Sequence, residues 1–282
     1  MSQRIEEALE RALSEVDAHG PPQVGHAIRY AVFPGGARVR PRLAGAVAEA
    51  IGGAHAPTVD AFGASLELLH CASLVHDDLP CFDDAATRRG KPSVHRIHGE
   101  PLALLAGDAL IVLAFENLAR FAAPSLCPSL VALLGRAAGA ARGLVAGQAW
   151  ESEPSIPIEA YHRAKTSSLF VAATQGGALA AGQPAEAWRS MGERLGDAYQ
   201  VADDLFDACG DGDGKPAGQD AVHGRPNAVE LWGAEGAVAR LRERVAEAAA
   251  AVPECAGADG LRALVVHMAE RLVPASLRQT AA

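Results

Sequence analysis

The sequence predicts an all-α fold on three observations. The chain of 282 residues is rich in alanine and leucine, and only 5% of its residues are aromatic, a composition that favours closely packed helices. Apolar residues recur at steps of three or four, the period of an α-helix, as at Leu69, Ala72 and Val75. No segment shows the alternation of apolar and polar residues that indicates a strand. Because no shift in composition marks a boundary, residues 1–282 are expected to form a single domain.

Glycine and proline separate the expected helices, because neither residue continues a helix well. Pro80, for example, lacks the backbone N–H that would extend the helix before it. In the first half of the chain, the runs between such breaks predict helices at residues 5–16, 26–32, 43–51, 58–79 and 101–121. In the second half, helices are expected at residues 129–151, 158–166, 168–181, 185–209, 227–232, 234–251 and 260–272.

Glycine also predicts close packing and loops. Gly139, Gly143 and Gly147 recur at steps of four within one expected helix, and such small residues should let a neighbouring helix approach closely. The segment 83–99 is expected to be irregular. The segment 210–218, made of Gly, Asp, Lys and other loop-forming residues, is a candidate lid.

The formal net charge of −9 argues against a nucleic-acid partner, because binding DNA or RNA needs a basic face. It does not exclude anionic substrates, since a local group of Arg, Lys and metal can dominate inside a cleft. The five cysteines are scattered, which argues against a disulfide framework or a zinc site and favours a cytoplasmic protein. The N-terminus carries no signal-peptide core, and no run approaches the roughly 20 apolar residues of a transmembrane helix, so no membrane span is expected.

An acidic cluster follows the helix expected over residues 58–79. Its carboxylates are Asp77, Asp78, Asp83 and Asp84. His70, Ser73 and Asp77 lie at i, i+3 and i+7, and therefore share one face of that helix. The negative end of the helix dipole disfavours more negative charge there, so a hard cation such as Mg²⁺, which prefers oxygen ligands, is expected. The alternative is a solvated acidic loop.

A second acidic cluster repeats this arrangement in the helix expected over residues 185–209. Gln200, Asp203 and Asp207 share one helix face at i, i+3 and i+7, and Asp204 lies beside them. Two such clusters on an apolar background are hard to explain as two solvated faces. We therefore expect both to face a common site.

Cationic residues accompany the carboxylates. Gly35-Gly36 is followed by Arg38, Arg40 and Arg42 at alternate positions, just before a helix whose free N–H groups favour phosphate. The alternative is an ordinary glycine turn with exposed arginines. Arg88-Arg89 follows the first acidic cluster. Carboxylates bind a diphosphate through Mg²⁺ and cations bind one directly, so a site with both can hold two diphosphates.

These motifs, in this order, closely resemble the trans-isoprenyl diphosphate synthase family, also called polyprenyl synthetases. The matching segments lie between about residues 25 and 230 and are Gly35-Gly36-Ala37-Arg38-Val39-Arg40-Pro41, Asp77-Asp78-Leu79-Pro80-Cys81-Phe82-Asp83, Arg88-Arg89-Gly90-Lys91-Pro92, Gly147-Gln148, Lys165-Thr166 and Gln200-Val201-Ala202-Asp203-Asp204-Leu205-Phe206-Asp207. The resemblance implies an all-α bundle of antiparallel helices around a deep central cavity, usually a homodimer.

The resemblance also implies roles for individual residues. Mg²⁺ would be ligated by Asp77, Asp83 and Asp203, with Asp78, Asp204 and Asp207 assisting directly or through water. The allylic diphosphate (dimethylallyl, geranyl or farnesyl) would be contacted by Arg88, Lys165, Thr166, Gln200 and Lys215. Isopentenyl diphosphate would be held by Arg40, His70 and Arg89. The implied reaction is the Mg²⁺-dependent head-to-tail condensation of these two substrates.

The sequence resembles most closely the geranylgeranyl diphosphate synthases of bacteria that make carotenoids and bacteriochlorophyll. Ala72 lies five residues before Asp77, about 7.5 Å deeper along the helix at 1.5 Å per residue. Farnesyl-forming bacterial relatives tend to carry an aromatic ring at that place. Because Ala72 and Ser73 are small, the growing chain should pass them, and Leu69 or other helices should stop it later. The predicted product is geranylgeranyl diphosphate.

The chain departs from the family pattern at Ala37, where a lysine is usual. The lost contact should weaken the binding of isopentenyl diphosphate, and Arg38 or Arg42 is expected to compensate. Three alternatives remain open: a farnesyl diphosphate synthase, a terpene cyclase, and a regulatory subunit of a hetero-oligomeric prenyl synthase. The cations expected to hold isopentenyl diphosphate argue against the cyclase, and two complete acidic clusters argue against the subunit.

Overall fold

The computed structural model describes residues 2–33, 36–53, 55–209, 227–270 and 273–274, and nearly all of its elements are helices. The elements of the first half are α1 Ser2–His19, α2 Pro22–Val32, α3 Val39–Ile51, α4 Ala56–Asp77, β1 Thr87–Arg88, β2 Lys91–Pro92, α5 Val94–His98, α6 Glu100–Phe121 and α7 Cys127–Ala138. Those of the second half are α8 Leu144–Trp150, α9 Ile158–His162, the π-helix η1 Arg163–Ser167, α10 Ser168–Ala180, the 3₁₀-helix η2 Glu186–Trp188, α11 Arg189–Cys209, α13 Ala228–Ala250 and α14 Ala258–Glu270. The predicted all-α fold is confirmed.

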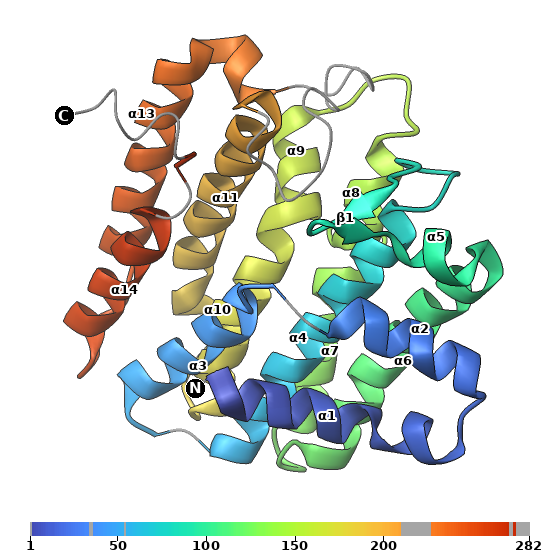
Figure 1. The fold of residues 1–282 in the computed structure, drawn as a ribbon. Coiled ribbons are helices and arrows are strands. Elements are labelled where there is room, and N and C mark those ends of the chain that lie inside the picture. Colours follow the sequence, from blue (N-terminus) through green and yellow to red (C-terminus); the bar gives the residue numbers. More distant parts are fainter. Residues whose placement is uncertain (1, 34–35, 54, 210–226, 271–272, 275–282) are drawn as a thin grey trace.

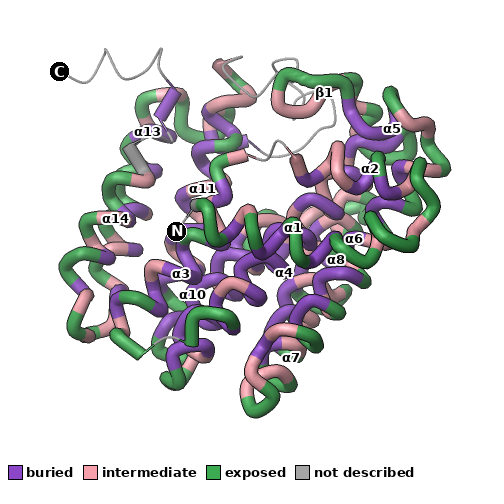
Figure 2. The backbone as a smooth tube through the Cα atoms, turned by 60° about the horizontal axis from the view of Figure 1, so that its bottom comes forward, coloured by how far each residue is buried: buried purple, intermediate pink, exposed green. Residues whose placement is uncertain are grey.

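The long helix α4 lies at the centre of the bundle. It packs along α6 on one side and against α3 and α10 on the others, while α11 packs along α13 (Figure 1). Buried residues occur all round α4 from Thr58 to Val75, as expected for a helix that has no solvent face (Figure 2). The C-terminal ends of α4 and α11 lie at the same end of the bundle, so the two acidic clusters come together there.

One hydrophobic cluster runs from Ile5 in α1 to Val273 near the C-terminus. Small residues bring its helices close together. A Cβ atom at Gly176 of α10 would overlap the ring of Phe62 in α4, and one at Gly177 would overlap the carbonyl oxygen of Ala44 in α3. Glycine at these two positions therefore allows α10 to lie against both α3 and α4.

The helix expected over residues 129–151 is interrupted, which corrects the sequence prediction. α7 ends at Ala138, and α8 begins only at Leu144. Gly139 and Gly143 have extended backbones at the two helix ends. Two glycines four residues apart each cost about 1 kcal/mol in a helix, which favours the break. Of the three glycines at steps of four, only Gly147 lies inside a helix.

The segment 83–99, expected to be irregular, contains a small hairpin and the helix α5. Strands β1 and β2 are antiparallel, with Arg88 paired to Lys91. The two turn residues, Arg89 and Gly90, have φ values of 55° and 73°. Two successive positive φ values are typical of the tight type I′ turn, which matches the twist of a hairpin. The hairpin fixes Arg88 and Arg89 beside the end of α4.

Helix α6 corrects the expectation about apolar runs. It is 22 residues long, with a mean hydropathy of 1.8 over its most apolar 18 residues, so its length and composition would allow it to cross a membrane. Its buried face packs along α4, as in the core helix of a bundle. Several apolar residues on its other face remain exposed, among them Leu104, Leu105 and Val112.

Arg38 ties α3 to α1 and α4. It adopts a left-handed conformation, with φ of 50°, just before α3 begins. Its side chain is 3% exposed and donates hydrogen bonds to Glu6 and to Glu67, each at 2.8 Å, and to the carbonyl oxygen of Val32 at 2.9 Å. Burial lowers the pKa of Arg38, but Glu6 and Glu67 raise it by more, so the guanidinium stays charged.

The expectation that Arg38 compensates for Ala37 is therefore wrong. Its guanidinium is buried and held by Glu6 and Glu67, so it is not available to bind an anion at the surface. The other candidate, Arg42, is exposed at the surface of α3.

Replacing Arg38 tests this core ion pair. Arg38→Met should lower the free energy of unfolding by about 3–5 kcal/mol, because it leaves the buried Glu67 without its cation. Urea unfolding followed by circular dichroism measures the loss. The double variant Arg38→Met/Glu67→Met should recover most of it. Arg42→Met is the surface control, with a change within about 0.5 kcal/mol. Equal losses for the single and double variants would contradict this account.

Candidate functional site

A cavity of about 980 Å³ opens between α4 and α11 and continues toward α6, α7 and α8. Most of the residues that the sequence singled out line it. These are Arg40, Leu69, His70, Ala72, Ser73, Asp77, Asp83, Arg88, Arg89, Lys165, Thr166, Gln200, Asp203 and Asp207. Two aspartates, Asp78 and Asp204, lie outside this lining, and Lys215 and the segment 210–218 lie outside the described residues.

Carboxylates from both acidic clusters form the mouth of the cavity. Asp77 and Asp83 come from the end of α4 and the loop after it, and Asp203 and Asp207 come from α11. Oδ1 of Asp77 is buried and has no hydrogen-bond partner, while its Oδ2 lies 3.8 Å from Nη2 of Arg88. A buried carboxylate oxygen without a donor is costly unless a cation meets it.

These residues fit a hard divalent cation. Within the described parts of the chain, no three His, Cys, Asp or Glu side chains form a ready-made metal site. Mg²⁺ does not need one, because it keeps several waters and binds through one or two carboxylates together with substrate phosphates. Asp77 lines the same cavity as Asp203 and Asp207 of α11, and its unpartnered oxygen suits that mode of binding.

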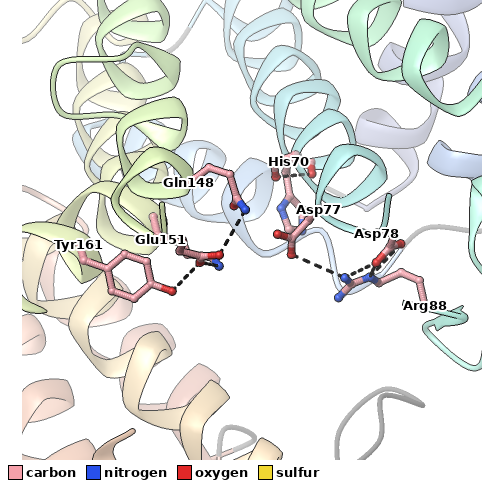
Figure 3. Close-up of polar contacts among 9 residues, drawn as sticks. His70, Asp77, Asp78, Arg88, Gln148, Glu151 and Tyr161 are labelled. Atoms are coloured by element: carbon pink, nitrogen blue, oxygen red, sulfur yellow. Dashed lines mark hydrogen bonds and ion pairs between the residues drawn. The ribbon is translucent and has the colours of Figure 1, made fainter. Parts of the chain in front are cut away.

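The second aspartate of each Asp-Asp pair is buried and has partners within the protein. Asp78 accepts hydrogen bonds from Nε of Arg88 at 3.0 Å and from Nη2 of Arg88 at 2.5 Å (Figure 3). Asp204 accepts from Nε2 of Gln200 at 2.9 Å and from the backbone N–H of Ala228 at 2.8 Å. Adjacent helix residues point about 100° apart, so one member of each pair lines the cavity and the other orients a neighbour.

Arginine side chains lie near His70 of α4. Nη2 of Arg89 lies 3.4 Å from Nε2 of His70. Burial lowers the pKa of His70 well below its usual value, and the charges of Arg40 and Arg89 lower it further. The imidazole is therefore neutral at pH 7 and can accept a hydrogen bond from Arg89.

Arg40 completes this group. Its guanidinium lies 5.0 Å from the centre of the Phe170 ring, and its Nε is buried without a hydrogen-bond partner. Burial lowers the pKa of Arg40, yet arginine remains protonated in proteins. An arginine held by a ring, with a donor left over, is suited to receive an anion.

Lys165 and Thr166 lie in the π-helix η1 between α9 and α10. Such single π turns occur frequently at functional sites. Thr166 Oγ1 donates to Oε1 of Gln200 at 2.5 Å, which links η1 to α11. Lys165 forms an ion pair with Glu151. The Glu151 carboxylate also accepts hydrogen bonds from Tyr161 and Gln148 (Figure 3). Glu151 follows Gly147-Gln148 within one helical turn, so a place near the cavity could be expected for it from the sequence. Its pairing with Lys165 and the contribution of Tyr161 could not.

Apolar and small residues form another part of the cavity wall. Ala72 and Leu69 line it from α4, and the hydroxyl of Ser73 is satisfied by the carbonyl oxygen of His70 at 2.9 Å. The sequence analysis did not identify the wall contributed by α6, namely Ile111 and Phe115. These two residues are inconspicuous in an apolar helix, and only the packing of α6 along α4 turns them toward the cavity.

Comparisons with known proteins agree with this site. The family model described as "Polyprenyl synthetase" matches residues 21–257. A protein of Cereibacter sphaeroides named geranylgeranyl diphosphate synthase is 53% identical over 98% of this chain and 97% of its own length. A Rhodobacter capsulatus protein of the same name is 50% identical over 98% of each chain.

Solved structures share the fold. A geranyltransferase from Legionella pneumophila superposes with a TM-score of 0.80 at 28% identity, covering 96% of this chain and 93% of that one. A geranyltransferase from Helicobacter pylori, complexed with magnesium and isoprenyl diphosphate, gives 0.80 at 27% identity, covering 95% of this chain and 96% of that one. A geranylgeranyl pyrophosphate synthetase from Pyrococcus horikoshii gives 0.79 at 28% identity, covering 96% of each.

Proposed function

Because the chain belongs to the polyprenyl synthetase family, we propose that it condenses isopentenyl diphosphate with an allylic diphosphate to make geranylgeranyl diphosphate. The two relatives with 50–53% identity over nearly the whole chain carry that name. One observation carries the proposal: a group of carboxylates and a separate group formed by two arginines, Arg40 and Arg89, with neutral His70 line one cavity that also has apolar walls. Such a cavity can hold two diphosphates and one long hydrocarbon.

Mg²⁺ is the proposed cofactor, held by Asp77, Asp83 and Asp203 together with the allylic diphosphate. The buried, unpartnered oxygen of Asp77 supports this assignment, as does the magnesium in the Helicobacter pylori structure. When bound, Mg²⁺ neutralises the diphosphate and makes it a better leaving group. We propose that Asp207 assists at this mouth and that Asp78 and Asp204 act by holding Arg88 and Gln200.

The protein's own residues then carry the reaction. Arg88 and Lys165 bind the allylic diphosphate and stabilise the negative charge that develops on it as the allylic C–O bond breaks. Arg89, Arg40 and neutral His70 hold isopentenyl diphosphate, whose double bond attacks the allylic carbon and forms the new C–C bond. The proton lost from the isopentenyl unit passes to the released diphosphate. The apolar walls exclude water, which would otherwise capture the allylic cation.

The small residues in the wall of the cavity and the names of the two similar bacterial proteins support a C20 product. Ala72 lines the pocket without blocking it, so a farnesyl group can extend past α4 toward Phe115 of α6. The alternative product is farnesyl diphosphate. The alternative of a regulatory subunit is opposed by the carboxylates of both acidic clusters and the cations that line one cavity.

We further propose that the protein is a homodimer joined through α5 and α6. Their outer faces expose apolar residues, with Leu105 53% and Val112 64% exposed. Ile97 and Leu104 extend the same apolar surface. Asp108 lies among them on the outer face of α6 and is also exposed. Several exposed large apolar residues close together are typical of a surface that another protein covers.

The metal proposal is tested at Asp77. Asp77→Asn should lower kcat by about a hundredfold, because it removes charge from the place where the departing diphosphate is stabilised. Its half-saturating Mg²⁺ concentration should rise as well. Asp84→Asn is the matched control, since Asp84 is exposed and pairs with Arg96, and asparagine tolerates its φ of 44°. A similar loss in both variants would contradict the assignment.

The product proposal is tested by chromatography of the prenyl chains made from labelled isopentenyl diphosphate and each allylic primer. The wild type should make mainly a C20 product. Ala72→Phe places a ring in the pocket and should shorten the main product to C15. Phe115→Ala removes a ring from the part of the wall formed by α6 and should lengthen the product. A wild type that stops at C15 would refute the C20 assignment while keeping the chemistry.

The dimer proposal is tested by sedimentation. Val112→Lys puts a charge into the proposed interface, and it should convert the dimer to a monomer because a buried unpaired charge is costly. Val266→Lys, on exposed α14, is the control and should leave the mass unchanged. A wild type that sediments as a monomer at micromolar concentration would refute the proposal.

A further inference from the structure

We infer that Glu151 is a positioning residue that holds the Lys165 ammonium on the cavity wall, ready for the allylic diphosphate. The inference deepens the proposed function and rests on it. It assigns a specific task to a carboxylate that lies apart from both acidic clusters, at the C-terminal end of α8.

Three donors surround the Glu151 carboxylate. Oε1 accepts from the hydroxyl of Tyr161 at 2.7 Å and pairs with Nζ of Lys165, and Oε2 accepts from Nε2 of Gln148 at 3.3 Å (Figure 3). The Glu151 side chain is 12% exposed and that of Lys165 is 25% exposed. The ion pair is thus largely shielded from water, and its carboxylate is fixed from two other directions.

The backbone brings these side chains together. Gly147 of α8 lies directly against η1, since a Cβ atom at Gly147 would lie 2.5 Å from the backbone nitrogen of Lys165 and 2.6 Å from its Cα. Only glycine allows that approach. Glu151 follows Gly147 by four residues, one helical turn, and therefore lies on the same side of α8. The contact between α8 and η1 presents Glu151 to Lys165.

The pair leaves Lys165 able to bind an anion. A lysine ammonium has three N–H donors, so its bond to Glu151 does not by itself prevent it from donating to a diphosphate as well. A free lysine side chain samples many rotamers and loses that freedom when it binds an anion. Glu151 removes this freedom beforehand, which is preorganisation: the ordering is complete before the substrate arrives. Lys165, Gln148 and Glu151's neighbour Tyr161 also line or border the same cavity.

Two other readings are possible for such a pair. Glu151 could withhold Lys165 from the substrate, so that its removal would strengthen binding. It could instead serve only to join α8 to α9, with no effect that passes through Lys165. Both readings make predictions that differ from ours for the affinity of the allylic substrate.

The test is a double-mutant cycle on Glu151→Gln and Lys165→Ala, with the KM of farnesyl diphosphate and of isopentenyl diphosphate measured for each variant. Glutamine keeps the shape and an acceptor for Tyr161 but removes the charge. Glu151→Gln should raise the KM of farnesyl diphosphate about tenfold. It should leave the KM of isopentenyl diphosphate within twofold, because that substrate is assigned to Arg40, His70 and Arg89. In the Lys165→Ala background, Glu151→Gln should have no further effect. Glu151→Asp, which keeps the charge on a shorter side chain, should give an intermediate value.

Three results would overturn the inference. Additive effects in the cycle would mean that Glu151 acts on structure and not through Lys165. A lower KM for farnesyl diphosphate in Glu151→Gln would mean that Glu151 withholds the lysine. Equal rises in both KM values would mean a general distortion, and thermal unfolding of each variant checks for it.

The proposed function can fail separately. It fails if the wild type makes no prenyl diphosphate. The same cycle, measured by calorimetry as the dissociation constant of inorganic diphosphate with Mg²⁺, does not require turnover and still tests whether Glu151 acts through Lys165.

Discussion

The structure depends on concentrating negative charge at one end of a helical bundle without letting that charge disrupt it. Helices α4 and α11 both end in aspartates that line one cavity, and carboxylates close together repel each other. In each adjacent pair of aspartates, the two side chains have different surroundings. Asp77 and Asp203 line the cavity, whereas Asp78 and Asp204 are buried against Arg88 and against Gln200 with the start of α13. Part of the acidic charge is thereby neutralised within the protein, and the rest is directed at a cation.

The helices and their shared faces were predictable from the sequence because they follow from local periodicity. The spacing of His70 and Asp77, and of Gln200 and Asp203, placed these residues on two helix faces that the structure turns toward one cavity. The family resemblance assigned Mg²⁺ to Asp77 and Asp203, and these are the members of the two pairs that line the cavity. What the partners Asp78 and Asp204 do instead was not predictable, because it depends on how α4 and α11 are rotated in the bundle, and that rotation is set by packing against other helices. The role of Glu151 escaped for the same reason, since it depends on how closely α8 approaches η1.

The sequence predictions that the structure corrected, at Arg38, at the hairpin and at α6, also failed for physical reasons. Arg38 stands among alternate arginines, and spacing alone suggested a surface cation. Arg38 has a left-handed backbone conformation, and its side chain is buried in the core, where it forms an ion pair with Glu67. The hairpin at 87–92 has strands of two residues, too short for any alternation to register. The composition of α6 is that of a membrane span, but its packing against α4 is that of a core helix, and composition does not distinguish the two.

Helix α6 joins two properties that are usually considered separately. Phe115 and Ile111 look inward on the pocket that receives the hydrocarbon, and Val112, between them in sequence, looks outward from the same turns. A shift or rotation of α6 would change both the cavity wall that it contributes and its exposed apolar face. A change in α6 that makes room for another five-carbon unit would therefore also alter the exposed surface around Val112.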